Sequence, residues 1–478
     1  MLFNSIEFAV FLPVLFCLYW FVAGKIRVQN ALLLIASYFF YGWWDWRFLS
    51  LIAFSSSVDY FVGIGLGKTN NKAKRKILLL ISILVNIGFL AFFKYFDFFA
   101  ENFYKTFTFL GQPISDPILL NIILPVGISF YTFQTLSYSI DTYTRKLEPT
   151  KDIIAFFAFV SFFPQLVAGP IERATNLLPQ FYKNRVFKYD EASDGMRQIL
   201  WGLFKKIVIA DNCAIYANDI FSNYGNYSGS TLLLGAIFFA FQIYGDFSGY
   251  SDIAIGTSRL FGFNLMRNFA FPYFSRDIAE FWRRWHISLS TWFRDYVYIP
   301  LGGSRGGTWM KVRNIFIIFI VSGFWHGANW TFIAWGALNA VYFLPLMLLK
   351  KNRMNTDMIA EGRLLPNLRE TAQIGTTFFI TLIAWVFFRA ETVSQAVAYI
   401  FGIFSDSLFS IPEVFPKKII LLIFLFILTE WFQRNKQHAL QFVEIKYPAI
   451  FRWSLYYCVV MVIWMFGGNQ QEFIYFQF

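Results

Sequence analysis

Long apolar stretches separated by short polar loops run through almost the whole chain. A helix needs about 20 mainly apolar residues to cross the hydrocarbon core of a bilayer. By this criterion the pattern predicts membrane helices at 8–23, 31–44, 48–66, 77–99, 117–140, 153–168, 232–245, 376–388, 394–404, 419–432 and 454–466. The chain is therefore predicted to be all-α and to cross a membrane several times.

Proline and glycine interrupt two of these stretches. Pro125 and Gly127 fall inside 117–140, and 153–168 runs into Pro164, Gly169 and Pro170. Proline removes a backbone donor and bends a helix, and irregular backbone survives at membrane depth only inside protein or beside a water-filled cavity. The second site is interpreted either as a re-entrant turn lining a cavity or as an ordinary helix end followed by a loop.

Two further segments mix polar and apolar residues. The alternation over 195–221 predicts an amphipathic or shallow helix. The segment 264–311 carries interleaved charged and aromatic residues, a composition typical of a segment that lies at or dips into the membrane interface.

The apolar stretch 314–349 is too long for one crossing. Its 36 residues would make a helix of about 54 Å, against a hydrocarbon core of about 30 Å. Basic residues flank it on both sides, and such residues favour the cytoplasmic face. We therefore expect the chain to enter the membrane and return, turning near 326–329 and placing His326 deep in the protein.

Composition supports a membrane protein. Hydrophobic residues make up 57% of the 478 residues, 63 of them phenylalanine, and only 15% are charged. No long polar segment could form a soluble domain, so we expect one membrane domain over 1–478. The net charge of +12 falls in short loops, as in the positive-inside pattern, and does not indicate nucleic-acid binding. The first apolar stretch lacks a basic start and a cleavage site, so it is interpreted as a retained span.

Two of the three histidines, His286 and His326, lie in aromatic-rich motifs 40 positions apart. Titratable side chains are costly in a membrane and are usually functional there. A histidine can serve as general base near neutral pH, and a second polar group can polarise a carbonyl or stabilise an oxyanion. His326 fits the base and His286 the second group. The alternative is that both are hydrogen-bonded core residues.

Other polar residues are given lesser roles. Asp246 and Asp252 should face the protein interior, where they either tie helices together, which we favour, or support the active site. Gly245 and Gly249, four apart, allow close helix approach. His438, in a basic loop, is expected at the solvated surface. No metal site is expected, because neither His286 nor His326 has Cys, Asp or Glu at ligand spacing, and Cys17, Cys213 and Cys458 are scattered.

The motifs around these histidines strongly resemble the membrane-bound O-acyltransferase (MBOAT) family, in particular its branch for alginate O-acetylation and related bacterial polysaccharide acetylation. The matching stretches are RRWHISLS at 283–290, WFRDYVYIPLGG at 292–303, FWHGANW at 324–330, FPQ at 163–165, AGPI at 168–171, YGDFSGY at 244–250 and FIYFQF at 473–478. By this resemblance, His326 corresponds to the catalytic histidine and His286 to the second active-site position.

The resemblance also implies a fold and a reaction. The fold would be a ring of tilted helices with re-entrant segments around a central funnel. The donor would be a cytoplasmic thioester, acetyl-CoA, with no metal, in the cytoplasmic (inner) membrane of a bacterium. The acetyl group would pass outward, through a periplasmic or extracellular partner of the SGNH-hydrolase type, to a polysaccharide.

Other functions remain open at this point. Within the family they are D-alanyl transfer to teichoic acid, which uses a carrier-protein thioester, and peptidoglycan O-acetylation. Outside it, the chain could be a transporter with a histidine proton relay, although no repeated halves support that. A structural scaffold for an exporter is a further alternative, and it predicts that His326 can be replaced without consequence.

Overall fold

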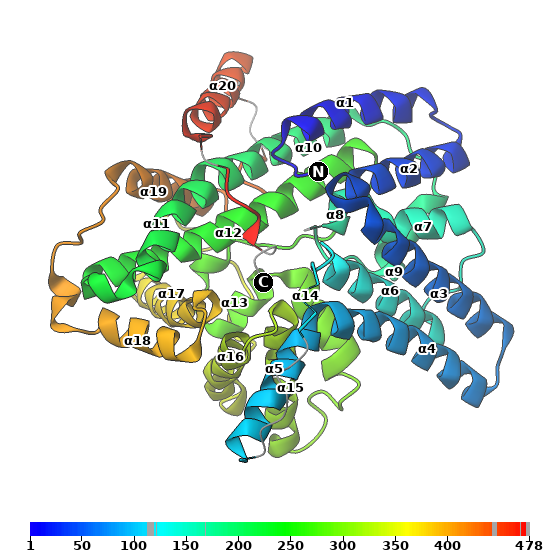
Figure 1. Cartoon of the computed structure of the whole chain (residues 1–478). Coiled ribbons are helices and arrows are strands. Elements are labelled where there is room, and N and C mark those ends of the chain that lie inside the picture. Colours follow the sequence, from blue (N-terminus) through cyan, green and yellow to red (C-terminus); the bar gives the residue numbers. More distant parts are fainter. Residues whose placement is uncertain (112–118, 121, 168, 442–446, 469, 475–478) are drawn as a thin grey trace. The chain divides into compact units, whose positions relative to one another are not determined.

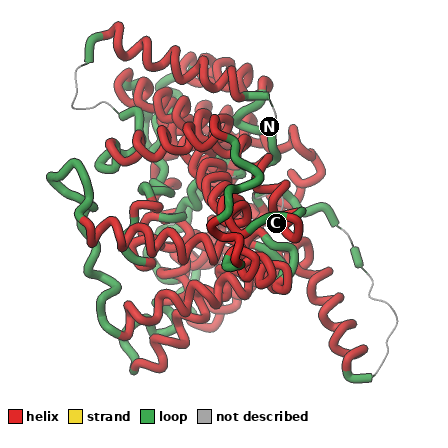
Figure 2. Tube along the Cα trace, turned by 90° about the vertical axis from the view of Figure 1, so that its left-hand side faces the viewer, coloured by secondary structure: helices red, strands yellow, loops and turns green. Residues whose placement is uncertain are grey.

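The computed structural model describes residues 1–111, 119–120, 122–167, 169–441, 447–468 and 470–474, and within these ranges the chain forms helices, turns and loops with no strand (Figure 2). The chain divides into two compact units: the first comprises 1–192 and 257–266, and the second 193–256 and 267–478. The functional residues named above lie in the second unit, so the first is described briefly.

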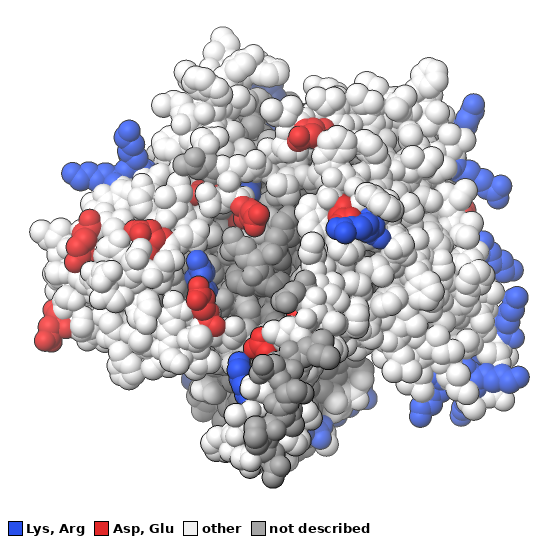
Figure 3. Space-filling view, in the orientation of Figure 1, with Lys and Arg blue, Asp and Glu red and all other residues white. Residues whose placement is uncertain are grey.

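Six helical stretches among the described residues are long and apolar enough to cross a membrane: Ile26–Lys68, Lys72–Phe109, Gly229–Leu260, Trp330–Leu348, Leu368–Arg389 and Ala449–Phe466. Uncharged residues form most of the surface visible in Figure 3, and many lysines and arginines stand at the edges of that view. The chain is therefore an all-helical, multi-pass membrane protein, as the hydrophobic pattern predicts.

Figure 1 shows the helices of the first unit; all but the short Ala174–Leu177 fall within or overlap the predicted stretches, and the helix predicted over 117–140 begins only at Ile128. They are α1 (Ile6–Phe21), α2 (Ile26–Asp45), α3 (Leu49–Lys68), α4 (Lys72–Leu90), α5 (Phe96–Phe109), α6 (Ile128–Tyr143), α7 (Ile153–Ser161), α8 (Phe163–Leu166) and α9 (Ala174–Leu177). The interruption at Gly127 is confirmed, because α6 begins directly after this residue, whose φ is +76°. Residues 117, 118 and 121 of that stretch lie outside the described residues.

The second interrupted stretch bends inside the protein. Helix α7 ends at Ser161, and α8 begins just before Pro164. Both Phe163 and Glu172 are fully buried, so protein surrounds this irregular backbone, as membrane depth would require. The re-entrant turn itself stays a prediction, and Ala168 lies outside the described residues.

Helices that lie wholly or mainly in the second unit are α10 (Tyr189–Leu203), α11 (Asp211–Ser222), α12 (Gly229–Leu260), α13 (Ile278–Arg284), α14 (Ile287–Phe293), α15 (Thr308–His326), α16 (Trp330–Leu348), α17 (Leu368–Arg389), α18 (Val393–Ile403), α19 (Lys417–Phe432) and α20 (Ala449–Phe466). Helices α15 and α16 form the predicted hairpin, with its turn at 327–329. The element α12 is longer than predicted, because it continues through the motif at 244–250.

The segment 195–221, expected to form an amphipathic or shallow helix, is helical but is more buried in its middle than that pattern indicates. Its middle, a π-helical stretch at Phe204–Ala210, is buried, and Lys205 and Lys206 lie inside the protein. Close helix approach explains this. A Cβ added to Gly249 would stand 2.8 Å from the carbonyl oxygen of Gly202, so only glycine allows α12 to lie so near. The predicted role of Gly249 is thereby confirmed.

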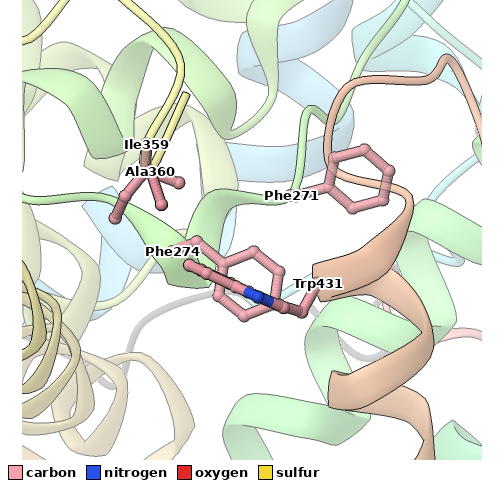
Figure 4. Close-up of a cluster of buried hydrophobic side chains, with 5 residues drawn as sticks. All are labelled: Phe271, Phe274, Ile359, Ala360 and Trp431. Carbon is pink, nitrogen blue, oxygen red and sulfur yellow. The ribbon is translucent and has the colours of Figure 1, made fainter. Parts of the chain in front are cut away.

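The segment 264–311, for which a position at or dipping into the membrane interface was expected, is mostly buried in the protein over 268–293 and mostly exposed over 299–310. Its charges neutralise one another: Glu280, 1% exposed, pairs with Arg276 at 3.0 Å and with Arg284 at 2.7 Å. Phe271 and Phe274 anchor the loop that leads into α13, because they pack with Ile359, Ala360 and Trp431 in one hydrophobic cluster (Figure 4). Paired charges therefore let this polar segment enter the core of the second unit.

Candidate active site

His326 is the last residue of α15, at the closed end of the α15–α16 hairpin. The turn that follows is fixed by Asn329, which caps α16 by accepting a hydrogen bond from Thr331 N at 3.0 Å. Gly323 allows the two helices to approach, because an added Cβ would overlap the carbonyl oxygen of Phe332. His326 is therefore placed by a rigid crossing of two helices.

Aromatic rings enclose the His326 imidazole. Its ring centre lies 4.9 Å from Trp325, 5.3 Å from Trp335 and 5.2 Å from Phe388. Only 5% of the residue is exposed. The rings of α16 and α17 thus limit the orientations of the imidazole and exclude bulk water from it.

His286 lies between two short helices, α13 and α14, in the left-handed backbone region with φ +44°. A non-glycine residue there carries strain, which surrounding contacts must hold. Asn268 supplies two of them: its backbone oxygen accepts from Ile287 N at 2.9 Å, and its side-chain oxygen lies 3.0 Å from His286 Nδ1. The edge-to-face ring of Phe247, 4.6 Å away on α12, completes the packing.

The structure brings the two sequence-predicted histidines together. Their ring centres lie 6.4 Å apart, which leaves no direct hydrogen bond between the imidazoles. Burial lowers the pKa of His286 to about 3, so this ring is neutral at physiological pH. Two imidazoles at this spacing, shielded from bulk water, can act together on one small reacting group.

A cavity of about 620 Å³ runs beside the α15–α16 hairpin. Its described lining combines apolar side chains of α15 and α16 with five cations and no acid; the cations are Arg283, Arg294, Lys311, Lys350 and Arg353. Lys311 stands in the first turn of α15, 15 residues and so about 22 Å of helix before His326. The cavity is of a size typical for ligand sites, and its cations favour an anionic ligand.

Neither histidine lines this cavity, but two of its lining residues lie close to His326. Ser322, which lines it, lies one helical turn before His326. Trp282 lines it as well and packs at 5.7 Å on Trp335, the ring that contacts His326. A long ligand with its charge near Lys311 can therefore direct its other end toward His326.

Buried ion pairs hold α12 beside the site. Lys206 bridges Asp246 and Asp211, at 2.7 Å each, and Lys205 pairs with Asp252 at 2.6 Å. Near the far end of the sequence, Gln471 O accepts from Lys206 Nζ at 3.1 Å. Both acids on α12 are thus internal, as predicted, and their bonds match the structural role that the sequence analysis favours.

His438 is not solvated, contrary to the expectation. It is 1% exposed, and its Nε2 lies 3.2 Å from Asp194 Oδ1 on α10. The loop that carries it folds back onto the second unit, which the local sequence does not indicate. It therefore ties two distant segments together.

Sequence reasoning missed Asn268 and the cavity cations. Asn268 sits in a polar segment, where one asparagine gives no signal of its own. The cations were interpreted only as markers of membrane sidedness, because their convergence depends on how α13, α15 and α16 pack.

The sequence is similar to several proteins of known families. The family model of the membrane-bound O-acyltransferases matches residues 4–383. The probable alginate O-acetylase AlgI of Pseudomonas putida is 39% identical over 417 residues, 87% of this chain and 82% of that protein. The peptidoglycan O-acetyltransferase of Helicobacter pylori is 36% identical, over 84% and 79% of the two chains. The teichoic acid D-alanyltransferase of Bacillus subtilis is 30% identical, over 50% and 62%.

Proposed function

This chain belongs to the membrane-bound O-acyltransferase family and is thus an O-acyltransferase. From that premise we propose that it moves acetyl groups outward for O-acetylation of an exported polysaccharide. The donor is a cytoplasmic acetyl thioester, acetyl-CoA. The protein works in the bacterial cytoplasmic membrane with an SGNH-hydrolase-type partner outside it. The observation that carries the proposal is the pairing of His286 and His326, with ring centres 6.4 Å apart, close to a cation-lined cavity whose lining includes Ser322, one helical turn before His326.

The cavity fits the proposed donor. Acetyl-CoA carries its phosphates at one end and its thioester at the other end of a long arm. Phosphates near Lys311, Lys350 and Arg353 would meet complementary charge. The arm would then lie along the apolar wall of α15, with the thioester directed toward His326.

The reaction uses the two histidines as follows. His326 removes the proton of an acceptor hydroxyl while that oxygen attacks the thioester carbonyl. The tetrahedral intermediate collapses by breaking the carbon–sulfur bond, and the thiolate takes the proton from His326. His286 is the second polar residue at the reacting groups. Positioned general-base catalysis contributes typically 10²–10⁴-fold, so loss of His326 should remove nearly all product.

D-alanyl transfer to teichoic acid is the main rival. The likeness to the Bacillus subtilis D-alanyltransferase covers half of this chain, whereas that to the Pseudomonas putida protein covers 87%. This difference in coverage supports acetyl transfer. Because the Helicobacter pylori relative is a peptidoglycan O-acetyltransferase, peptidoglycan is a second candidate acceptor for this chain.

The test measures base-labile acetate on exported polysaccharide from cells that carry wild type, His326→Ala or His438→Ala at matched membrane levels. His438 serves as the control, because it is an equally buried histidine with a tethering role. Acetate present with wild type and His438→Ala and absent with His326→Ala supports the proposal. Equal acetate from all three contradicts the role of His326, and D-alanine in place of acetate favours the rival.

A further inference from the structure

We propose that Asn268 is a positioning residue that fixes the tautomer of His286, so that Nδ1 carries the proton and Nε2 presents a lone pair toward the reacting groups. This inference rests on the proposed function only for the use of that lone pair. The tautomer itself follows from hydrogen-bond geometry within the second unit.

The orientation of the Asn268 side chain is set by its neighbours. The backbone N–H of Ser288 can only donate, and it points at Asn268 Oδ1 at 3.4 Å. The hydroxyl of Ser288 donates to the same atom at 2.9 Å. On the other side, Asn268 Nδ2 donates to Ser251 Oγ of α12 at 3.0 Å. The atom beside His286 is therefore the amide oxygen, which only accepts.

An oxygen that only accepts determines the proton on His286. Asn268 Oδ1 lies 3.0 Å from His286 Nδ1, so this nitrogen must carry the hydrogen. The ring is neutral because it is buried, and a neutral imidazole has one N–H. Nε2 is then unprotonated, and it has no hydrogen-bond partner among the described residues. A buried acceptor left in this state is a position prepared for a ligand.

The side chains that surround His286 are mostly aromatic, and they do not compete with Asn268 for the proton on Nδ1. The rings of Phe247, Phe269 and Trp325 surround it, and among the described residues His326 is the titratable group that faces it. Charged residues lie near Asn268: Lys205, Asp252, Arg267 and Glu430 line a small cavity together with it and with His438. Asn268 thus separates the charged cluster from the neutral imidazole.

The loop that carries Asn268 is itself held firmly. Asn268 is fully buried, and Ala270 N donates to Arg284 O at 2.9 Å, so the loop pairs with the end of α13. Phe271 and Phe274 fasten the same loop to Trp431 of α19 (Figure 4). A side chain on so rigid a support can hold the strained backbone of His286 and its ring together.

This tautomer determines what His286 can bind. A lone pair at Nε2 accepts a hydrogen bond and cannot donate one to an oxyanion, so the partner is a hydroxyl-bearing group. A sugar presents more than one hydroxyl, so His286 can hold one while His326 deprotonates another. From the sequence, His286 was expected to polarise the carbonyl or to stabilise the oxyanion. The inferred tautomer gives it orientation of the acceptor in place of these roles.

The direct test is solid-state NMR of the full chain in lipid, with ¹⁵N-labelled histidine and a His438 variant to help assign the three signals. We expect a neutral His286 with its hydrogen on Nδ1. A hydrogen on Nε2 would overturn the inference, whatever acyl group the protein transfers. The proposed function fails separately, through the product found on the polysaccharide.

Substitution of Asn268 provides a second readout. Asn268→Asp keeps an acceptor at Nδ1 but adds a negative charge, which favours the imidazolium form and raises the pKa of His286. In an NMR pH titration, His286 of this variant should gain its second proton at a pH at least one unit above wild type. An unchanged titration would show that the Asn268 side chain does not control His286.

A cell assay separates positioning from general damage. Asn268→Leu removes the acceptor, whereas Asn314→Leu removes an equally buried asparagine that donates to the backbone oxygens of Leu301 and Gly303. Per molecule of membrane protein, we expect Asn268→Leu to lose at least tenfold in acetate and Asn314→Leu to stay near wild type. Equal losses in both variants would indicate that Asn268 is merely structural.

Discussion

Substitution of Gly323 by alanine tests whether the crossing of α15 and α16 positions His326. The new Cβ would lie 3.1 Å from the carbonyl carbon of Phe332 and 3.3 Å from Gly336 Cα, where ordinary contacts begin at 3.4 Å. The carbonyl oxygen of Phe332 is closer still. These are backbone atoms, so they cannot rotate away, and the two helices must separate by several tenths of an ångström or more.

Because Gly323 precedes His326 by three residues, it lies on the same face of α15, and the displacement reaches the imidazole. Overpacking of this kind costs about 1–3 kcal/mol of stability. A misplacement of about 1 Å costs a catalyst about 10²-fold in rate. We therefore expect Gly323→Ala to fold at reduced yield and to lose between about tenfold and a hundredfold in acetylation per molecule.

The assay is acetate on exported polysaccharide, divided by the amount of protein in the membrane. Gly375→Ala in α17 is the matched control, because a Cβ there meets no atom within 4 Å. Alanine in a helix interior stabilises it by about 0.5–1 kcal/mol relative to glycine, so this control should retain full activity. Wild-type acetylation by Gly323→Ala would refute the argument that backbone contact at this crossing sets the position of His326.

Two further predictions concern buried and cavity-lining charges. Lys206→Met removes the cation between Asp211 and Asp246 and should lower the free energy of unfolding by about 3–5 kcal/mol. Thermal unfolding in detergent measures this loss, and Lys206→Arg, which keeps the charge, should lose clearly less stability. Arg353→Ala removes one cavity cation and should raise KM for acetyl-CoA severalfold with little change in kcat. High salt should reduce the difference in KM between the variant and wild type. An unchanged KM would argue against phosphate binding at Arg353.

The sequence predicted most of the membrane helices, because such a helix requires a long run of apolar residues and this run is visible in the sequence itself. It also predicted the α15–α16 hairpin, since 314–349 is longer than one crossing. It failed at His438, which is buried and not solvated. There, a titratable side chain lies inside because a partner distant in sequence binds it, as Asp194 does for His438 across 244 positions. No local pattern reveals such pairing.

The active site was predictable only in part. Family motifs singled out His286 and His326, but no spacing rule brings residues 40 apart to within 6.4 Å. That distance depends on the strained turn at His286 and on the glycine crossing at Gly323. Asn268 lies 18 residues before His286, and its role appears only when the backbone N–H of Ser288 shows which way its amide faces.

The contact between Asp246 and the segment around Ile474 has a consequence for how the protein is made. Ile474 N donates to Asp246 Oδ2 at 2.6 Å, across 228 positions of sequence. When α12 first leaves the ribosome, its carboxylate lacks this donor, and it gains the donor only once translation has passed residue 474. A truncated product keeps the ion pair of Asp246 with Lys206 but lacks the backbone donor at Oδ2, so one oxygen of a buried carboxylate loses its partner, a defect that lowers stability and exposes the product to cellular quality control.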